Sequence, residues 1–365
     1  MKTKQIITVC LLAAFLAGFG LWSVLRTPDA VSQAERRPLA QRPAFTAAGF
    51  LSGKFSDALD DFAADQFPLR EQLRTLRSLV SYDVMGQRDV NGVYLSQGYA
   101  AKLDFPLNTA SVERAADRFR YVYDTYLSGT DTKVYLSVIP DKGYFMAPSS
   151  GRPSMDYDAL VSQLRESTPY MTYIDLFDLL TIDDYYRTDA HWRQERLLPV
   201  AAAICEALGA DAPGTFTEKT LSPFYGAYYG QAALPMAPDT LTYLESADTK
   251  AAEVTGPELD GAQPVYRPEL LDGTDGYDVF LSGAQAVLTV TSPNVHNGRH
   301  LVLFRDSFGS SLAPLLLGSF ERITLVDLRY ISAARLADYA DLSDATDVLY
   351  LCSTAVWNNG GTLRE

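Results

Sequence analysis

The chain has 365 residues, a formal net charge of −14 and a hydrophobic content of 47%. This composition excludes a disordered or collagen-like chain, and the length suffices for one large domain or for one domain with a smaller appendage. Because the average surface potential is negative and repels phosphate backbones, nucleic acid is not expected as a partner.

An apolar run stands at the N-terminus. Residues 6–25 contain no charged side chain, and at a helical rise of about 1.5 Å per residue they span roughly 30 Å, the thickness of a bilayer core. Lys2 and Lys4 precede the run, so the positive-inside rule places the N-terminus in the cytoplasm and the bulk of the chain outside. We predict that residues 1–25 anchor the protein in the cell membrane by a single pass.

A cleaved signal peptide is the alternative interpretation of the same run. Ser32-Gln33-Ala34 offers a small-residue cleavage site, whose use would give a secreted protein. The apolar run is longer than a usual signal-peptide core, which favours the uncleaved anchor. Residues 26–45 contain three prolines and no apolar periodicity, as expected of a linker between membrane and domain.

Residues 46–365 have the pattern of a folded domain. Apolar residues recur at helical spacing over residues 55–80, and Phe67-Pro68 interrupts them, which predicts two short amphipathic helices. Strand-like runs that are apolar on both faces then alternate with helix-like runs, which predicts a three-layer α/β/α sandwich with a mostly parallel sheet. The strand-like runs are residues 134–139, 171–175, 301–304, 323–326 and 348–351, and the helix-like runs are residues 157–165, 193–208, 308–317 and 332–339.

The segment of about residues 213–297 interrupts this alternation. It is rich in Gly, Pro, Tyr and Thr, and it contains strand-like pieces at residues 277–281 and 286–290. We interpret it as a β-rich insertion or flap.

Cysteine and histidine are scarce. Of the three cysteines, Cys10 lies in the apolar N-terminal run, which leaves Cys205 and Cys352 as the one pair that could form a disulfide, and we do not favour it. Three histidines and the absence of CxxC and HExxH motifs provide little material for a metal site. We predict neither a metal nor a cofactor.

A serine stands where the apolar strand of residues 301–304 meets a helix-forming stretch. Ser307 follows Arg305-Asp306 in the sequence LVLFRDSFGSSLAPLLLG, and the carboxyl end of a strand in an open α/β sheet is the usual place for a ligand. A helix N-terminus also offers backbone N–H groups to a developing oxyanion. The alternative is that Asp306 or Ser307 only caps the helix, since both are preferred N-cap residues.

A serine nucleophile needs a base within hydrogen-bond reach. Of the three histidines, His191 lies in YYRTDAHW, two residues after Asp189, whereas His296 and His300 have the pattern of loop and strand-edge residues. A carboxylate so close in sequence can orient the imidazole and stabilise the imidazolium, as the acid of a Ser-His-Asp triad does. The alternative is that Asp189 only caps the helix that follows.

The segment TDAHW, followed by a helix and then by a distant strand-RDSF-helix, resembles the DHHW family of exported bacterial proteins. It is also similar, more distantly, to the SGNH-like catalytic domains of alginate O-acetyltransferases. The resemblance covers about residue 45 to the end, and it includes the blocks DQFPLREQL, NGVYL, VIPDKGYF, YIDLFDLL, FYGAYY and VDLRY. It implies an SGNH-like fold in which Asp189 is the orienting acid, His191 the general base and Ser307 the nucleophile.

Two positions depart from the family pattern. Ala190 replaces the second residue of the D-H-H-W signature, and Arg305 stands where SGNH hydrolases have the glycine of G-D-S. A bulky cation is therefore expected to border the nucleophile.

Other residues are candidates for binding the oxyanion or the substrate. The backbone N–H of Ser307 is the first candidate donor, and Arg305 and the side-chain amides of Asn294, Asn358 and Asn359 are further ones, although loop asparagines usually close turns. Tyr144, Tyr185 and Tyr186 could stack on a carbohydrate, or they could be buried in the core.

The sequence thus predicts an extracytoplasmic serine-dependent O-acyltransferase or esterase. The expected substrate is an acyl group, with acetyl favoured, on a cell-surface polysaccharide or acylated sugar, and transfer and hydrolysis are both open. The resemblance further implies a membrane-bound acyltransferase that exports the acyl group as a partner. The alternative is an SGNH-like scaffold without turnover that binds carbohydrate or serves assembly at the cell surface, since fold alone does not ensure chemistry.

Overall fold

The computed structural model describes residues 2–32 and 34–364. Gln33, in the middle of the candidate cleavage site, lies outside the described residues. Chain contacts divide the protein into two compact units, residues 2–90 with Gly230–Pro235 and residues 91–364 without that insert. The second unit carries Asp189, His191 and Ser307.

The N-terminal unit begins with helix α1 (Lys2–Leu25). Among the described residues, one helical stretch, Thr3–Ser23, is long and apolar enough to cross a membrane, with a mean hydropathy of 2.1. Its position near the N-terminus suits both a membrane anchor and a signal sequence.

The rest of this unit is helical apart from one short hairpin. The two predicted amphipathic helices are confirmed as α3 (Lys54–Asp65) and α4 (Arg70–Leu79), and the chain leaves the helical path around Pro68. The expected linker contains β1 (Val31–Ser32) and β2 (Arg37–Pro38), which pair in a hairpin. Helix α2 (Ala47–Leu51) comes after the linker and contacts α3. Arg37 pairs with Asp65 at 2.6 Å, so the linker is fastened to the helices.

An eight-stranded sheet forms the centre of the second unit, in the order β10-β9-β11-β13-β12-β14-β5-β6. The five strands from β13 to β6 are parallel, and β11, β9 and β10 extend them in antiparallel fashion. The strands are β5 (Lys133–Ile139), β6 (Thr172–Ile174), β9 (Glu253–Thr255), β10 (Gln263–Pro264), β11 (Val287–Thr291), β12 (His300–Arg305), β13 (Arg322–Val326) and β14 (Asp347–Ser353). All five predicted strand-like runs of the parallel part are confirmed.

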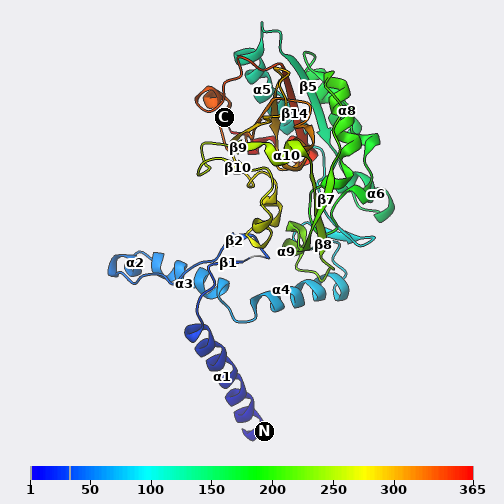
Figure 1. Ribbon diagram of the computed structural model, residues 1–365. Coiled ribbons are helices and arrows are strands. Elements are labelled where there is room, and N and C mark those ends of the chain that lie inside the picture. Colours follow the sequence, from blue (N-terminus) through cyan, green and yellow to red (C-terminus); the bar gives the residue numbers. More distant parts are fainter. Residues whose placement is uncertain (1, 33, 365) are drawn as a thin grey trace. The chain divides into compact units, whose positions relative to one another are not determined.

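Helices cover both faces of this sheet. Leu301 and Leu303 of β12 point into a core shared with helix α8 (Leu198–Leu208), and Val302 and Phe304 point into a second core shared with α5 (Thr109–Val122) and α7 (Tyr157–Ser167). Figure 1 shows α8 and α5 on opposite sides of β5 and β14. The predicted three-layer α/β sandwich with a mostly parallel sheet is confirmed.

The helices on the carboxyl side of the later strands are short. Residues 308–317 form α11 (Phe308–Leu312) and a 3-10 turn (Ala313–Leu316), and residues 332–339 form a 3-10 helix (Ala333–Asp338) in place of the expected α-helix. The chain ends with α12 (Thr354–Asn358) and one more 3-10 turn (Gly360–Thr362).

Residues 213–297 contain the hairpin of β7 (Thr217–Phe224) and β8 (Asp239–Glu245), and they also supply β9, β10 and β11 to the central sheet. The predicted strand at residues 277–281 is wrong. These residues begin as a 3-10 turn (Gly276–Val279), because the side chain of Asp275 accepts a hydrogen bond from the backbone N–H of Tyr277 at 2.9 Å and starts the turn.

Cys205 and Cys352 are both free and buried. They belong to the cores on opposite faces of the sheet, so the sheet itself keeps their sulfur atoms apart. The disulfide that the sequence left open is therefore absent.

Other elements of the second unit are a small hairpin and a helix after β5. They are β3 (Val93–Ser96), β4 (Tyr99–Lys102) and α6 (Lys142–Ser150).

Candidate active site

Ser307 stands at the carboxyl end of β12, directly before α11. The side chain of Ser307 makes no capping hydrogen bond; Asp306 caps instead, because its Oδ1 accepts from the backbone N–H of Phe308 at 3.0 Å. The Oδ2 atom of Asp306 accepts from the backbone N–H of Ser353, at the end of the neighbouring β14, at 2.9 Å. The carboxylate of Asp306 thus fixes the strand-to-helix corner between β12 and α11, and it leaves the hydroxyl of Ser307 for another partner.

That partner is His191. Ser307 Oγ lies 2.7 Å from His191 Nε2, and His191 Nδ1 lies 2.5 Å from Asp189 Oδ1. Asp189 is fully buried, and Ser307 is half-buried, so the row of three groups runs from the interior to the surface. This is the arrangement in which a carboxylate holds Nδ1–H and leaves Nε2 to accept the serine proton.

Backbone groups fix the carboxylate of Asp189. Its Oδ1 also accepts from the backbone N–H of His191 at 3.0 Å, and its Oδ2 accepts from the backbone N–H of Ala227 at 2.6 Å. Hydrogen bonds from N–H groups stabilise the charged form of a carboxyl group. Two backbone N–H groups therefore hold the Asp189 carboxylate against the imidazole, and the bond to its own loop also shapes the turn.

An aromatic ring lies flat against the imidazole. Tyr277 stacks on His191 with ring centroids 3.8 Å apart and an interplanar angle of 9°. The hydroxyl of Tyr277 donates to Ser311 Oγ at 2.7 Å, and burial raises the pKa of Tyr277 well above its ordinary value, so the phenol stays neutral. Stacking and this hydrogen bond together restrict the rotation of the His191 ring.

The tryptophan after His191 joins its loop to the helix that begins at Ser307. Trp192 Nε1 donates to the backbone carbonyl of Phe308 at 3.1 Å and to Ser311 Oγ at 2.9 Å. Gln194 adds a third connection, because its Nε2 donates to the carbonyl of Ser311 at 2.6 Å. Distant parts of the sequence are thereby held in one geometry around the His191–Ser307 contact.

Two charged side chains hold the chain just before Asp189. Asp239 accepts from the backbone N–H groups of Arg187 and Thr188 at 3.0 and 2.8 Å, and from the hydroxyl of Thr188 at 2.6 Å. Lys142 Nζ donates to the carbonyl of Tyr186 at 2.9 Å. Lys142 follows the carboxyl end of β5, two strands from β12, so this support comes from the same edge of the sheet as Ser307.

Burial lowers the pKa of Lys142 to about 7, against the opposing effect of the carboxylates of Asp189, Asp239 and Asp141. The unfolded lysine titrates near 10.4, so between about pH 7 and pH 10 the unfolded chain binds more protons, and the free energy of unfolding rises with pH. We expect this rise between pH 7 and 9.5 to be smaller in Lys142→Met than in wild type, as measured by urea unfolding. The exposed Lys102→Met is the matched control and should behave as wild type, whereas an equal rise in Lys142→Met would contradict the assignment.

Arg305 is buried, and its guanidinium points toward Asp327 and not into the site as the sequence suggested. Its Nη1 lies 3.8 Å from Asp327 Oδ2 and 3.4 Å from the backbone oxygen of Asp306. Its aliphatic stem lies against Gly309 of α11, where a Cβ atom would collide with it. Arg305 therefore acts beneath the corner, in a buried ion pair with Asp327.

The asparagine candidates do not reach the site. Asn294 follows the end of β11, where Thr291 pairs with Arg322 at the start of β13. The Nδ2 atom of Asn294 donates to Asp248 Oδ1 at 3.1 Å. It lies at the amino edge of the parallel strands, about 20 Å of strand from the edge that carries Ser307. The assignment of Asn294 as an oxyanion donor is wrong. His300, which begins β12 and contacts Asp344, lies at the same amino edge.

Asn358 is near the carboxyl edge but has no donor to spare. Its Nδ2 donates to Asp104 Oδ1 at 2.6 Å and to the carbonyl of Pro106 at 3.2 Å, and its Oδ1 accepts from the backbone N–H of Asn108 at 2.6 Å. Both amide hydrogens are thus used, and the role of Asn358 is to tie α12 to the start of α5. Asn359 donates to the carbonyl of Ala355 at 3.0 Å within its own turn.

The three candidate tyrosines are packing residues. Tyr144 meets Phe145, Tyr157 and Phe177 edge to face, with centroids 4.9 to 5.0 Å apart. Tyr185 and Tyr186 are almost fully buried, and Tyr185 donates its hydroxyl to the carbonyl of Pro140 at 2.5 Å. The core interpretation therefore holds for Tyr185 and Tyr186, and the half-buried Tyr144 packs against the core that α5 shares.

Sequence reasoning missed Tyr277, Lys142 and Asp239 as parts of the site. Lys142 stands in the block VIPDKGYF directly after an apolar strand, so its place at the carboxyl edge could have been read from the sequence. Tyr277 and Asp239 lie in the segment that was interpreted as an insertion, and no motif there pointed to His191.

The stretch that contains Asp189, His191 and Ser307 is similar to a known family. Residues 177–326 match the family model described as DHHW protein. This segment matches the DHHW family. The predicted resemblance is confirmed, and the matched stretch contains Asp189, His191, Tyr277 and Ser307. No match was found among curated proteins.

Solved structures share the fold. A DHHW family protein from Eubacterium siraeum DSM 15702 is 21% identical, with a TM-score of 0.61 over 76% of this chain and 97% of that chain. Bacillus cereus PatB1 is 16% identical, with a TM-score of 0.59 over 73% of this chain and 96% of that chain. The O-acetyltransferase domain of Pseudomonas putida AlgJ is 14% identical, with a TM-score of 0.46 over 73% of this chain and 92% of that chain. At these identities the likeness to the DHHW protein and PatB1 establishes the fold.

Proposed function

We propose that this protein is a serine-dependent O-acyltransferase or esterase in which Ser307 is the nucleophile, His191 the general base and Asp189 the orienting acid. The observation that carries the proposal is the continuous hydrogen-bond row from Asp189 through His191 to Ser307 at the carboxyl edge of the sheet. The 2.7 Å contact lies within the 2.6 to 3.2 Å that base activation requires, and it favours catalysis over a scaffold without turnover.

In the first half-reaction, Ser307 Oγ forms a bond to the acyl carbon while its proton passes to His191 Nε2. The carbonyl electron pair moves onto the oxygen, and the backbone N–H of Ser307 is our candidate donor to that oxyanion. When the intermediate collapses, the bond to the leaving oxygen breaks, and this oxygen takes the proton from His191. The acyl group is then an ester of Ser307.

In the second half-reaction, a hydroxyl group of the acceptor gives its proton to His191 Nε2 and attacks the acyl carbon. The bond from the acyl carbon to Ser307 Oγ then breaks, and Oγ takes the proton back from His191. A sugar hydroxyl gives transfer, and water gives hydrolysis. Asp189 holds Nδ1–H throughout and stabilises the imidazolium that forms in each half. The buried Tyr277 ring also faces this imidazolium, and the negative face of an aromatic ring attracts a cation.

We place the reaction outside the cytoplasmic membrane, with α1 as an anchor and a cell-surface polysaccharide as the acceptor. The charge pattern around the apolar run supports this orientation, and cleavage of α1 as a signal sequence is the alternative. We also propose, from the family resemblance, a membrane-bound acyltransferase that exports the acyl group as the partner that supplies the acyl donor. One of the solved structures reported above is an O-acetyltransferase domain, that of Pseudomonas putida AlgJ.

The proposal is tested by the time course of aryl acetate hydrolysis by the full chain in detergent. An acyl-enzyme that forms faster than it breaks down gives a burst of phenolate equal to the enzyme concentration. We expect this burst, followed by a steady state that a polysaccharide acceptor accelerates. Release at the rate of buffer alone would contradict the proposal.

Tyr277 should act as a positioning residue for His191. We expect Tyr277→Leu to lower kcat/KM for aryl acetate by about ten- to a hundredfold, because a base misplaced by a fraction of an ångström loses reach to Ser307. Tyr277→Phe keeps the stacked ring and should recover most of the rate. Initial rates of both variants with aryl acetate provide the check; a rate of Tyr277→Leu equal to wild type, or a loss in Tyr277→Phe as large as in Tyr277→Leu, would contradict the assignment.

A further inference from the structure

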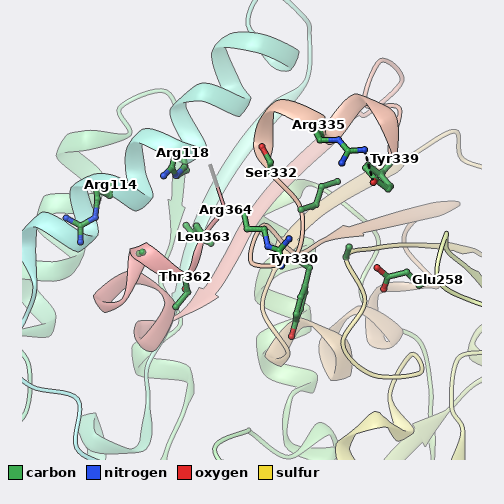
Figure 2. Close-up of a pocket in the computed structure, with 14 residues that line it drawn as sticks. Arg114, Arg118, Glu258, Tyr330, Ser332, Arg335, Tyr339, Thr362, Leu363 and Arg364 are labelled. Carbon is green, nitrogen blue, oxygen red and sulfur yellow. Dashed lines mark hydrogen bonds between the residues drawn. The ribbon is translucent and has the colours of Figure 1, made fainter. Parts of the chain in front are cut away.

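A large cavity of about 780 Å³ lies in the second unit, on the face of the sheet that α5 covers. We call it the arginine pocket, because Arg114, Arg118, Arg335 and Arg364 line it together with the single acidic residue Glu258. Figure 2 shows Arg114 and Arg118 on α5, with Arg335 and Tyr339 on the segment across the pocket. Its volume falls within the range of ligand-binding pockets.

The charge of this pocket opposes that of the whole chain. Four arginines against one glutamate line it, on a protein whose net charge is −14. Within residues 2–32 and 34–364, neither Arg114 nor Arg364 has an acidic partner within 4 Å. Asp338 offsets the charge of Arg335, and because charges beyond about 8 to 10 Å are screened at physiological salt, the remaining arginines give the pocket a positive local potential.

Two of the four arginine side chains have partners that favour one orientation. Arg335 pairs with Asp338 at 3.1 Å and lies over the ring of Tyr339, with its Cζ atom 5.4 Å from the centroid. Arg364 Nε donates to the carbonyl of Arg329 at 3.1 Å. Arginine offers a planar fork of donors that matches a carboxylate or phosphate, and fixing it in advance lowers the entropy cost of binding.

Exposed aromatic surface accompanies the arginines. Tyr330 is 43% exposed and Tyr339 is 39% exposed, and both line the pocket. A tyrosine ring offers an apolar face for the C–H face of a sugar and a hydroxyl for its polar groups. Arginines together with exposed tyrosines therefore suit an acidic sugar better than a simple inorganic anion.

Two segments of the pocket lining follow the strands on either side of β12. Its Tyr330 follows the carboxyl end of β13, and its Leu363 follows β14 through α12, while Ser307 follows β12, which lies between those two strands. Leu363 also lines a small cavity of about 10 Å³ together with Asp306, the neighbour of Ser307. The pocket lining and Ser307 thus belong to segments that follow three neighbouring strands.

We propose that the arginine pocket binds the acidic polysaccharide chain whose hydroxyl groups Ser307 acylates, a statement that rests on the proposed function. The ligand class is a glycan with carboxylate or phosphate groups, bound through Arg114, Arg118, Arg335 and Arg364 and stacked on Tyr330 and Tyr339. Distance along the sheet edge separates this site from the reacting atoms, so the pocket selects the polymer and the triad carries out the chemistry.

The test is direct binding by isothermal titration calorimetry to the full-length Ser307→Ala chain in detergent. The probes are an oligogalacturonate with carboxylates, a phosphomannan with phosphates, a neutral amylose oligosaccharide of equal length, and a single-stranded DNA of equal charge. We expect binding to one or both acidic glycans, with the stronger of the two identifying the group that the arginines recognise. Binding to amylose as tight as to both acidic glycans, binding to the DNA as tight as to the preferred glycan, or no binding to either acidic glycan would overturn the proposal.

Substitutions locate the bound chain. Arg114→Gln combined with Arg364→Gln should weaken binding about tenfold or more, since each charge-assisted hydrogen bond contributes about that factor, and should lessen its salt dependence. The matched control is Arg120→Gln, an exposed arginine on the same helix whose Nη2 donates to the carbonyl of Ser167; it should bind as the parent does. Unchanged binding in the double variant, or an equal loss in the control, would overturn the assignment.

This binding assay needs no turnover, so its result is separate from that of the aryl acetate assay. If the protein bound the acidic glycan but gave no acyl-enzyme, the pocket assignment would stand and the proposed chemistry would fail. If the protein gave an acyl-enzyme but bound neither glycan, only the pocket assignment would fail.

Discussion

Replacing Ser307 by alanine should lower kcat/KM for aryl acetate hydrolysis at least about 1,000-fold, because no other group can form the acyl-enzyme. His191→Ala should cost a similar factor, and the double variant little more, since residues that act as a unit give non-additive losses. Initial rates of the three full-length variants in detergent provide the measurement.

The control for this loss is Ser310→Ala, one turn further into α11. Ser310 is buried beside the site, and the proposed reaction gives it no role. It should hydrolyse the ester at nearly the wild-type rate. If Ser307→Ala and Ser310→Ala hydrolysed the ester equally fast, Ser307 would not be the nucleophile.

The second large effect is expected for Asp189→Asn, with a loss of about 10³- to 10⁴-fold in kcat. The amide oxygen can still accept from the backbone N–H of Ala227 and its NH₂ group would then face His191 Nδ1. This geometry favours the imidazole tautomer that carries its proton on Nε2, so the ring can no longer accept the proton of Ser307.

Thermal unfolding should show that Asp189→Asn remains folded, because the replacement is nearly isosteric. The exposed Asp158→Asn on α7 serves as the matched control and should keep the full rate. A rate for Asp189→Asn within a factor of a few of wild type would mean that the carboxylate does not orient the base.

The central part of the fold could be predicted because its strands are apolar on both faces. Residues 301–304 and 348–351 allow only burial between two layers, and β12 and β14 confirm this. The three residues of the hydrogen-bond row from Asp189 to Ser307 could also be picked out from the sequence, since Ser307 follows a strand directly and Asp189 lies two residues before His191. Local sequence carried this information.

Side chains whose partners are distant in sequence could not be placed. The amide of Asn358 is occupied by Asp104 and by the backbone of Asn108, about 250 residues earlier, and nothing near Asn358 in the sequence indicates this. Tyr277 reaches His191 only because a capped turn replaces the strand that its apolar neighbours suggested. In both cases, tertiary contacts override the local pattern.

Arg305 illustrates a third kind of error. Its position next to the nucleophile in sequence suggested a cation beside the reacting atoms. The strand ends at Arg305 and the backbone of Ser307 is already helical, however, and the guanidinium lies with Asp327, buried beneath the strand-to-helix corner. Proximity in sequence did not imply proximity of the charged atoms.

The most direct measurement is the location of the acetyl group in the full chain, quenched with acid within milliseconds of mixing with aryl acetate. Peptide mass spectrometry should find one acetyl group per chain, on the peptide that contains Ser307, and none on that peptide in His191→Ala. An acetyl group on another residue in wild type, or hydrolysis without any acetylated peptide, would contradict the account.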